Sequence, residues 1–176
     1  MRNKSLDVKR IVYLALFTAL VVVLQFIPIR FGAFELALSV PVIVVGAAVC
    51  GIGAGAWLGF VFGFVVLFLP GTTAFLSFSI IGTVVTVILK GALAGLTAGI
   101  VYRAIESKNR YIAVVVAAVV ATFVNTLVFI IGSLIFFDYD IATVIGIFVS
   151  LNFLVELLLN MVLVPTIYRI INIKKG

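Results

Sequence analysis

The chain places two ionisable residues, Lys90 and Glu156, inside long apolar stretches, and three amides occupy similar surroundings. Charged side chains within membrane-spanning segments are costly and usually mark a functional site. At 1.5 Å per helical residue, Lys90, Asn125 and Asn152 lie roughly 15 to 18 Å from the outer ends of their predicted helices. Glu156 follows one turn after Asn152, and Asn160 one turn later, so these three share a helix face. The spacing predicts a polar cluster near the middle of a bilayer.

Such a cluster allows three kinds of chemistry. Lys90 and Glu156 can form a permanent ion pair that fixes helix packing, with the asparagines bonding between helices. Lys90 can instead neutralise an anionic group of a small polar ligand and exchange Glu156 for a ligand carboxylate. Glu156 can also serve in a proton relay. The candidate substrate-binding residues are Lys90, Asn125, Asn152 and Glu156.

No catalytic constellation occurs in the sequence, which contains no histidine. It also has no paired carboxylates, no Ser-His-Asp set, no H-E-x-x-H metal motif and no Walker glycine-rich loop. We therefore expect no enzymatic activity, no metal site and no cofactor. The lone cysteine, Cys50, lies in an apolar run and is expected to be a small core residue. Uphill transport of a solute would need an ion gradient or a separate ATPase.

The composition indicates that membrane helices position these residues. Of the 176 residues, 65% are hydrophobic and 10% are charged, whereas soluble domains are about half apolar and a quarter charged. This excludes a water-soluble domain, a nucleic-acid-binding module and a disordered chain. Because about 20 apolar residues cross the hydrocarbon layer, we predict a single domain (1–176), all-α, with six transmembrane helices. The predicted spans are residues 11–27, 36–50, 56–69, 80–101, 111–137 and 142–171.

The basic residues determine the predicted orientation. They gather before the first span, between the fourth and fifth spans, and after the sixth. With six spans all three groups lie on one side, and the positive-inside rule places that side in the cytoplasm. The net charge of +6 then reflects lipid surfaces rather than an acidic partner. We expect a multi-pass protein of the plasma membrane with both termini cytoplasmic.

Two predicted outer connections are rich in aromatic residues. The first covers residues 28–35 and the second covers residues 70–79. Each can rest at the headgroup interface or act as a lid over an outward-facing site. The candidate gating residues are two charged and two aromatic side chains of the first connection: Arg30, Phe31, Phe34 and Glu35.

Small residues recur at four-residue spacing in three predicted spans. Such faces let helix backbones approach closely. We expect most of them to pack within one bundle, whereas a face left unused would dock another membrane protein. The faces are Ala15 with Ala19, Gly59 with Gly63, and Gly91 with Gly95 and Gly99.

Several short segments follow one another in a familiar order. They are 15–19 (ALFTA), 35–43 (ELALSVPVI), 89–96 (LKGALAGL), Tyr102-Arg103, 125–128 (NTLV) and 152–156 (NFLVE), with Pro165 beyond. In this order the chain resembles the substrate-binding S component of energy-coupling factor (ECF) vitamin transporters. It is most similar to the branch of pantothenate, riboflavin and pyridoxine-type binders. The resemblance covers nearly the whole chain.

The resemblance implies a six-helix bacterial membrane protein that binds one water-soluble vitamin from outside. It also implies partners, namely a transmembrane scaffold subunit and two cytoplasmic ATPase subunits of an ECF-type ABC importer, with no nucleic acid involved. By the same resemblance, Ala15 and Ala19 are the scaffold-docking residues, and the connection over residues 28–35 is the gate.

The substrate is inferred from Lys90. A buried lysine suits pantothenate, which carries a carboxylate, hydroxyls and an amide, so pantothenate is the expected vitamin. Riboflavin would need more aromatic stacking than Phe129, Phe148 and Phe153 offer, although it stays an alternative with a pyridoxine-type vitamin. Two other classes are also open. One is a stand-alone proton-coupled secondary transporter that uses Glu156, and the other is a structural membrane partner without a ligand.

Overall fold

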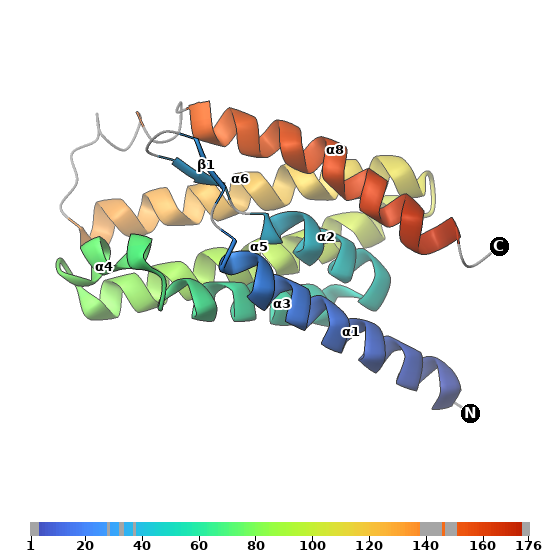
Figure 1. Ribbon diagram of the computed structural model, residues 1–176. Helices are drawn as coiled ribbons and strands as arrows, with labels where there is room; N and C mark the ends of the chain where they lie inside the picture. Colours follow the sequence, from blue (N-terminus) through green and yellow to red (C-terminus); the bar gives the residue numbers. More distant parts are fainter. Residues whose placement is uncertain are drawn as a thin grey trace.

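The computed structural model describes residues 4–27, 29–31, 34–36, 38–137, 146 and 151–173. Within these residues the chain is helical apart from one two-stranded hairpin. The helices are α1 (Lys4–Gln25), α2 (Ser39–Cys50), α3 (Ile52–Val66), α4 (Pro70–Leu76), α5 (Ile80–Ile105), α6 (Arg110–Phe136) and α8 (Leu151–Ile173), and the strands are β1 (Ile29–Phe31) and β2 (Phe34–Leu36). The longer helices run lengthwise as a bundle, with the first turn of α1 and the last turn of α8 at the same end (Figure 1).

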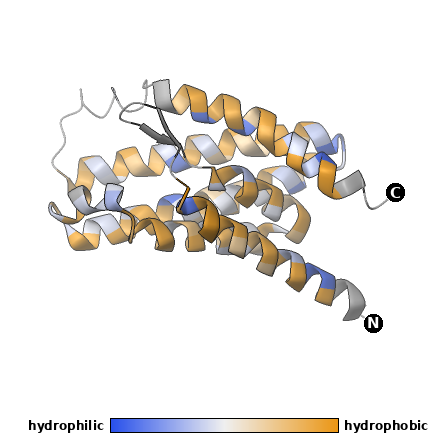
Figure 2. Cartoon of the chain, viewed as in Figure 1, coloured by the Kyte–Doolittle hydropathy of each residue, from blue (hydrophilic) through white to orange (hydrophobic). Residues whose placement is uncertain are grey.

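Four of the described helices are long and apolar enough to cross a membrane, namely α1, α5, α6 and α8. Helices α2 and α3 are apolar but have only 12 and 15 residues, which is about 18 and 22 Å of helix. Apolar residues cover most of the helical surface, and hydrophilic residues gather toward the end where α1 begins (Figure 2). The structure thus confirms a multi-pass, helical membrane protein, while the six spans and their orientation stay predictions.

The observed elements differ from the predicted spans mainly at the connections. The first helix begins at Lys4, before the predicted start of its span at residue 11. The last helix is described over Leu151–Ile173, so the predicted start of its span at residue 142 stays a prediction. Of residues 142–150, only Gly146 is described. Both outer connections contain regular structure that was not predicted. The first holds the antiparallel hairpin β1–β2, and the second holds α4, in which Pro70 occupies the first turn, where a missing N–H costs nothing.

Helices α3 and α5 pack backbone to backbone along their glycine faces. A Cβ atom on Gly59 would collide with the carbonyl oxygen of Gly91, and a Cβ atom on Gly55 would collide with that of Gly95. Likewise, a Cβ atom on Gly91 or Gly95 would collide with the carbonyl oxygen of the facing glycine of α3. Gly63 faces the backbone of α5 one turn further along. The glycine faces are therefore used inside the bundle, as predicted.

Helix α2 is the most enclosed part of the core. Ten of its twelve residues are buried, and Val44 and Val45 have no exposed surface. Its last residue, Cys50, is only 1% exposed, which confirms its prediction as a small core residue. The turn into α3 passes through Gly51, whose φ of 96° is a left-handed conformation that glycine adopts without strain. This turn lies at the same end of the bundle as the start of α1 (Figure 1).

Candidate functional site

Lys90 lies between two aromatic rings that come from the helices on either side of α5. It is ten residues past the start of α5, at a depth of about 15 Å along the helix. Its Nζ atom is 5.0 Å from the centroid of the Phe129 ring of α6 and 5.9 Å from that of Phe62 of α3. A cation over an aromatic face is attracted by the ring, most strongly where water is excluded. The two rings therefore hold the ammonium in place.

Three buried oxygen atoms near the level of Lys90 have no hydrogen-bond partner among the described residues. They are Oγ1 of Thr86, Oδ1 of Asn125 and Oε1 of Glu156, from α5, α6 and α8. The three side chains are 2%, 8% and 8% exposed. A buried polar atom left without a partner costs about 1–3 kcal/mol. Three such atoms on three helices make this cluster a candidate site for hydrogen bonds from a polar molecule.

Local spacing brings these oxygen atoms toward Lys90. Thr86 precedes Lys90 by one turn of α5, and Asn125 precedes Phe129 by one turn of α6, so each shares a helix face with a residue of the lysine site. Glu156 belongs to α8, and its carboxylate is near enough to the Lys90 ammonium for the two charges to interact.

Thr86 is exceptional among the buried threonines of the described bundle. Thr83 and Thr122 each donate to the carbonyl oxygen four residues earlier, the usual way for a helical threonine to satisfy its hydroxyl. The hydroxyl of Thr86 makes no such bond. Its side chain instead packs against Gly132 of α6, where a Cβ atom would collide with it.

Lys90 and Glu156 are coupled but do not form a direct ion pair. They interact through their charges, yet no contact within 4.0 Å joins them among the residues that the structure describes, and Oε1 of Glu156 has no hydrogen-bond partner. A permanent structural ion pair would need close geometry and satisfied lone pairs to offset its desolvation. The arrangement therefore favours a ligand-exchange role over the purely structural pairing.

Aromatic side chains cover the lysine site on the side of α4. Phe75 of α4 lies edge-on to Phe129, with ring centroids 5.4 Å apart, and it contacts Phe137 at 5.3 Å. Helix α4 is anchored to the end of α3 because the Thr72 hydroxyl donates to the carbonyl oxygen of Val66 at 2.6 Å. The second predicted connection thus places an aromatic ring of α4 next to the lysine site, while its role as a lid stays a prediction.

Asn160 has a structural partner of its own. Its Nδ2 atom donates to Oγ1 of Thr122 at 2.8 Å, and the residue is 1% exposed. Asn160 therefore joins α8 to α6 and lies outside the candidate binding set. Asn152 is the second residue of α8, and its side chain is outside what the structure describes. The depth expected for Glu156 counts from residue 142, and residues 142–150 apart from Gly146 lie outside the described set, so that depth stays a prediction.

The predicted gating residues lie in the hairpin. In its register Arg30 pairs with Glu35, and Phe31 pairs with Phe34. The side chains of these four residues are outside the described set. Strand β2 packs against α8, the helix that carries Glu156, so the hairpin is attached to one wall of the candidate site. Whether it opens and closes stays a prediction.

The predicted docking residues Ala15 and Ala19 are both exposed on α1. They differ in this respect from the glycines of α3 and α5, which face each other. The neighbouring Thr18 accepts a hydrogen bond from Nε1 of Trp57 at 3.3 Å, which ties this part of α1 to α3. The alanine face is available to a partner, and its docking role stays a prediction.

Sequence reasoning missed Phe62 and Thr86 as parts of the lysine site. Phe62 lies 28 residues before Lys90, and nothing in the local pattern shows that its ring faces the ammonium. Thr86 had a usable signal, because it precedes Lys90 by four residues and therefore shares its helix face.

The fold is that of a multi-pass helical membrane protein, and the polar cluster inside its apolar bundle is a candidate binding site. Residues 9–168 match the family described as "ECF transporter, substrate-specific component", and the chain belongs to that family. No curated protein and no solved structure matches the chain. The protein is therefore a membrane-embedded, substrate-binding component of an ECF transporter, and its family is one of transporter components.

Proposed function

We propose that this protein is the six-span S component that captures pantothenate from outside the cell for an ECF-type importer. The observation that carries the proposal is Lys90 held between Phe62 and Phe129, with partnerless acceptors nearby. An ammonium at this depth costs at least about 3 kcal/mol unless a partner compensates it. The aromatic rings compensate part of the charge, and a ligand carboxylate would compensate the rest.

The functional groups of pantothenate match the polar groups of the site. Its carboxylate fits Lys90, while its two hydroxyls and its amide N–H give three donors. The site offers three acceptors without partners: Oγ1 of Thr86, Oδ1 of Asn125 and Oε1 of Glu156. A site built to bond with donors rejects molecules that lack them, because its buried acceptors are then left unpaired.

The two other vitamins of the branch fit these groups less well. Riboflavin carries no carboxylate and needs a flat stacking surface, yet the Phe129 ring is already engaged by Lys90 and by Phe75. A pyridoxine-type vitamin brings hydroxyls for the acceptors but no anionic group for the lysine. Both stay alternatives within the same class of function.

The surrounding elements fit the remaining parts of this function. We propose that the β1–β2 hairpin is the gate, with Asn152 and Glu156 below it on α8, and that the exposed face of Ala15 and Ala19 docks the scaffold subunit. Two cytoplasmic ATPases would then drive release. Both termini would face the cytoplasm of a bacterial cell, because basic residues gather at that end.

The carboxylate is best tested with two ligands that differ only there. Pantothenol has the diol and amide of pantothenate but an alcohol in place of the carboxylate. We expect calorimetric titration of the purified protein to show pantothenate binding at least 30-fold more tightly than pantothenol, since removing one member of a buried charge pair costs about 2–5 kcal/mol. Equal affinities would exclude the Lys90 anchor. Mass spectrometry of ligand retained on purification would identify riboflavin or pyridoxine if either is the true cargo.

One observation favours a second function. The partnerless Oε1 of Glu156 is also what a proton-coupled secondary transporter would use. Uptake of labelled pantothenate in cells without the scaffold and ATPase subunits separates the two functions. The S-component proposal expects uptake to stop without them, whereas a stand-alone transporter would continue.

A further inference from the structure

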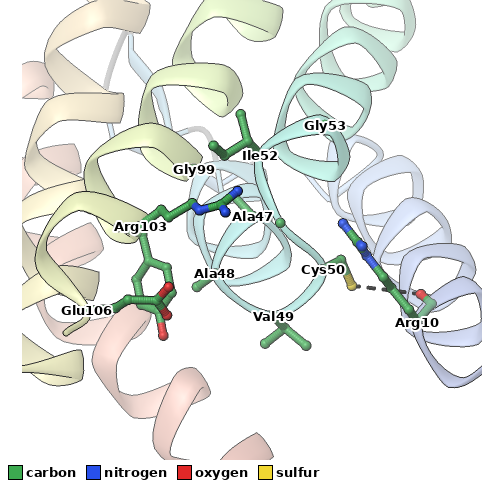
Figure 3. A pocket seen from close by; sticks show the side chains of 12 residues that line it. Arg10, Ala47, Ala48, Val49, Cys50, Ile52, Gly53, Gly99, Arg103 and Glu106 are labelled. Carbon is green, nitrogen blue, oxygen red and sulfur yellow. Dashed lines mark hydrogen bonds between the residues drawn. The ribbon is translucent and has the colours of Figure 1, made fainter. Parts of the chain in front are cut away.

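A polar cavity lies at the opposite end of the bundle from the hairpin (Figure 1). Its volume is about 500 Å³, within the usual range for small-molecule sites. The start of α1, the turn between α2 and α3, and the last turns of α5 form its walls. Arg10, Arg103 and Glu106 supply its charged groups (Figure 3). The proposed binding of substrate near the hairpin does not involve these three residues.

The two arginines approach the cavity from different helices. Arg103, in the last turn of α5, and Glu106, directly after that helix, lie on one side of the α2–α3 turn, and Arg10 of α1 lies on the other (Figure 3). The Arg10 guanidinium lies over the turn, because a Cβ atom on Gly51 would stand 2.6 Å from its Nη2 atom. The positive φ of Gly51 favours glycine at this turn, and the absence of a side chain there leaves the space that the guanidinium occupies.

The charges of this cavity are not neutralised within the described chain. Two guanidinium groups face one carboxylate, and no ion pair engages the three among the residues that the structure describes. The turn also leaves the start of α3 without a side-chain cap, so its backbone N–H groups add to the positive potential. Gly53 lines the cavity and has no atom within 4 Å of where its Cβ would be, which leaves open space beside these groups.

We propose that this cavity binds the phosphate group of an anionic phospholipid from the adjoining leaflet. Basic cavities between membrane helices on the cytoplasmic side are suited to such headgroups. A guanidinium binds phosphate oxygens in pairs through its planar fork of donors. The cavity is also lined by Ala47, Val49 and Ile52, so an apolar surface continues from the arginines along which an acyl chain can lie.

The test compares lipid retention by charge-matched variants. Native mass spectrometry and thermal shift would be recorded with phosphatidylglycerol, with phosphatidylcholine, and with inorganic phosphate alone. We expect one phosphatidylglycerol per protein and a loss of apparent affinity of about fivefold for each of Arg10→Gln and Arg103→Gln, equivalent to about 1 kcal/mol. Arg169→Gln removes the same charge from the exposed surface of α8 and should leave retention unchanged.

A second variant keeps the test independent of charge and folding. Gly53→Leu fills the open space without removing a cation and should lower phosphatidylglycerol retention while substrate binding at Lys90 persists. Three results would overturn the proposal. The first is an equal loss in the Arg169→Gln control, which would indicate bulk charge. The second is equal stabilisation by inorganic phosphate, which would indicate a soluble anion. The third is that the cavity variants retain lipid normally but no longer assemble with the scaffold subunit, which would assign the cavity to a partner subunit.

Discussion

Replacing Lys90 by methionine removes the ammonium while keeping a flexible apolar side chain of similar length. In the free protein the change removes two contacts with aromatic rings, at 5.0 and 5.9 Å, each contributing about 0.5–2 kcal/mol. It also removes the cost of holding a charge at this depth, about 2.5–3.5 kcal/mol. These contributions oppose each other and are of similar size. We therefore expect the melting temperature of the ligand-free protein to change little.

Ligand binding should respond far more strongly to the same substitution. If the ligand carboxylate is the partner of Lys90, its loss should weaken pantothenate binding by about 2–5 kcal/mol, or roughly 30- to 5,000-fold in Kd. The affinity for pantothenol should change much less, because pantothenol brings no charge to the site. Calorimetric titration with both ligands, and melting of the free protein, measure the two effects separately. Lys108→Met, in the exposed turn after α5, is the matched control and should bind as the wild type does.

The competing structural interpretation gives the opposite pattern. If Glu156 were the permanent partner, Lys90→Met would strand a buried carboxylate and destabilise the free protein by about 3–5 kcal/mol. Adding Glu156→Gln would then recover much of that loss, because the two residues would be energetically coupled. The absence of a direct contact between them argues against this outcome. A stable Lys90→Met protein with wild-type affinity would refute the carboxylate anchor and, with it, the argument for pantothenate.

Three further predictions concern docking, gating and packing. Ala15→Trp and Ala19→Trp should abolish co-purification with the scaffold subunit and leave ligand affinity unchanged; equal loss of ligand binding would mean that the face packs internally. Hydrogen exchange in the β1–β2 hairpin should slow when ligand is added, and an unchanged hairpin beside a protected α5 would count against a lid. Gly91→Ala should destabilise the protein by about 1–3 kcal/mol, because the new Cβ meets the backbone of Gly59. Gly53→Ala, which meets nothing within 4 Å, should not lower the melting temperature to a similar extent.

Sequence patterns predicted the parts of this fold that depend on local physics. The start of α5 at Ile80 and the burial of the glycine faces follow from hydropathy and from four-residue spacing. Both features are properties of single helices. The depth of Lys90 follows from the same arithmetic, since one helix start and a fixed rise per residue are enough to place it.

The parts that were missed depend on contacts between distant segments. The hairpin has strands of only three residues, too short for an alternating pattern, and its pairing is stabilised by neighbours rather than by propensity. The ring of Phe62 reaches Lys90 because α3 lies close against α5, and that rotation is not readable from either helix alone.

Helix α5 connects the two polar regions of the molecule. Lys90 lies near its middle, and Arg103 lies thirteen residues further along, near the opposite end. Between them the helix is fixed to α3 at Gly91 and Gly95, where carbonyl oxygens occupy the space of a side chain. Such close backbone contacts resist sliding, because small shifts bring atoms into collision. Opening of the substrate site is therefore expected to fall to the hairpin and α8, while α3 and α5 stay together as the fixed wall that holds Lys90 in place.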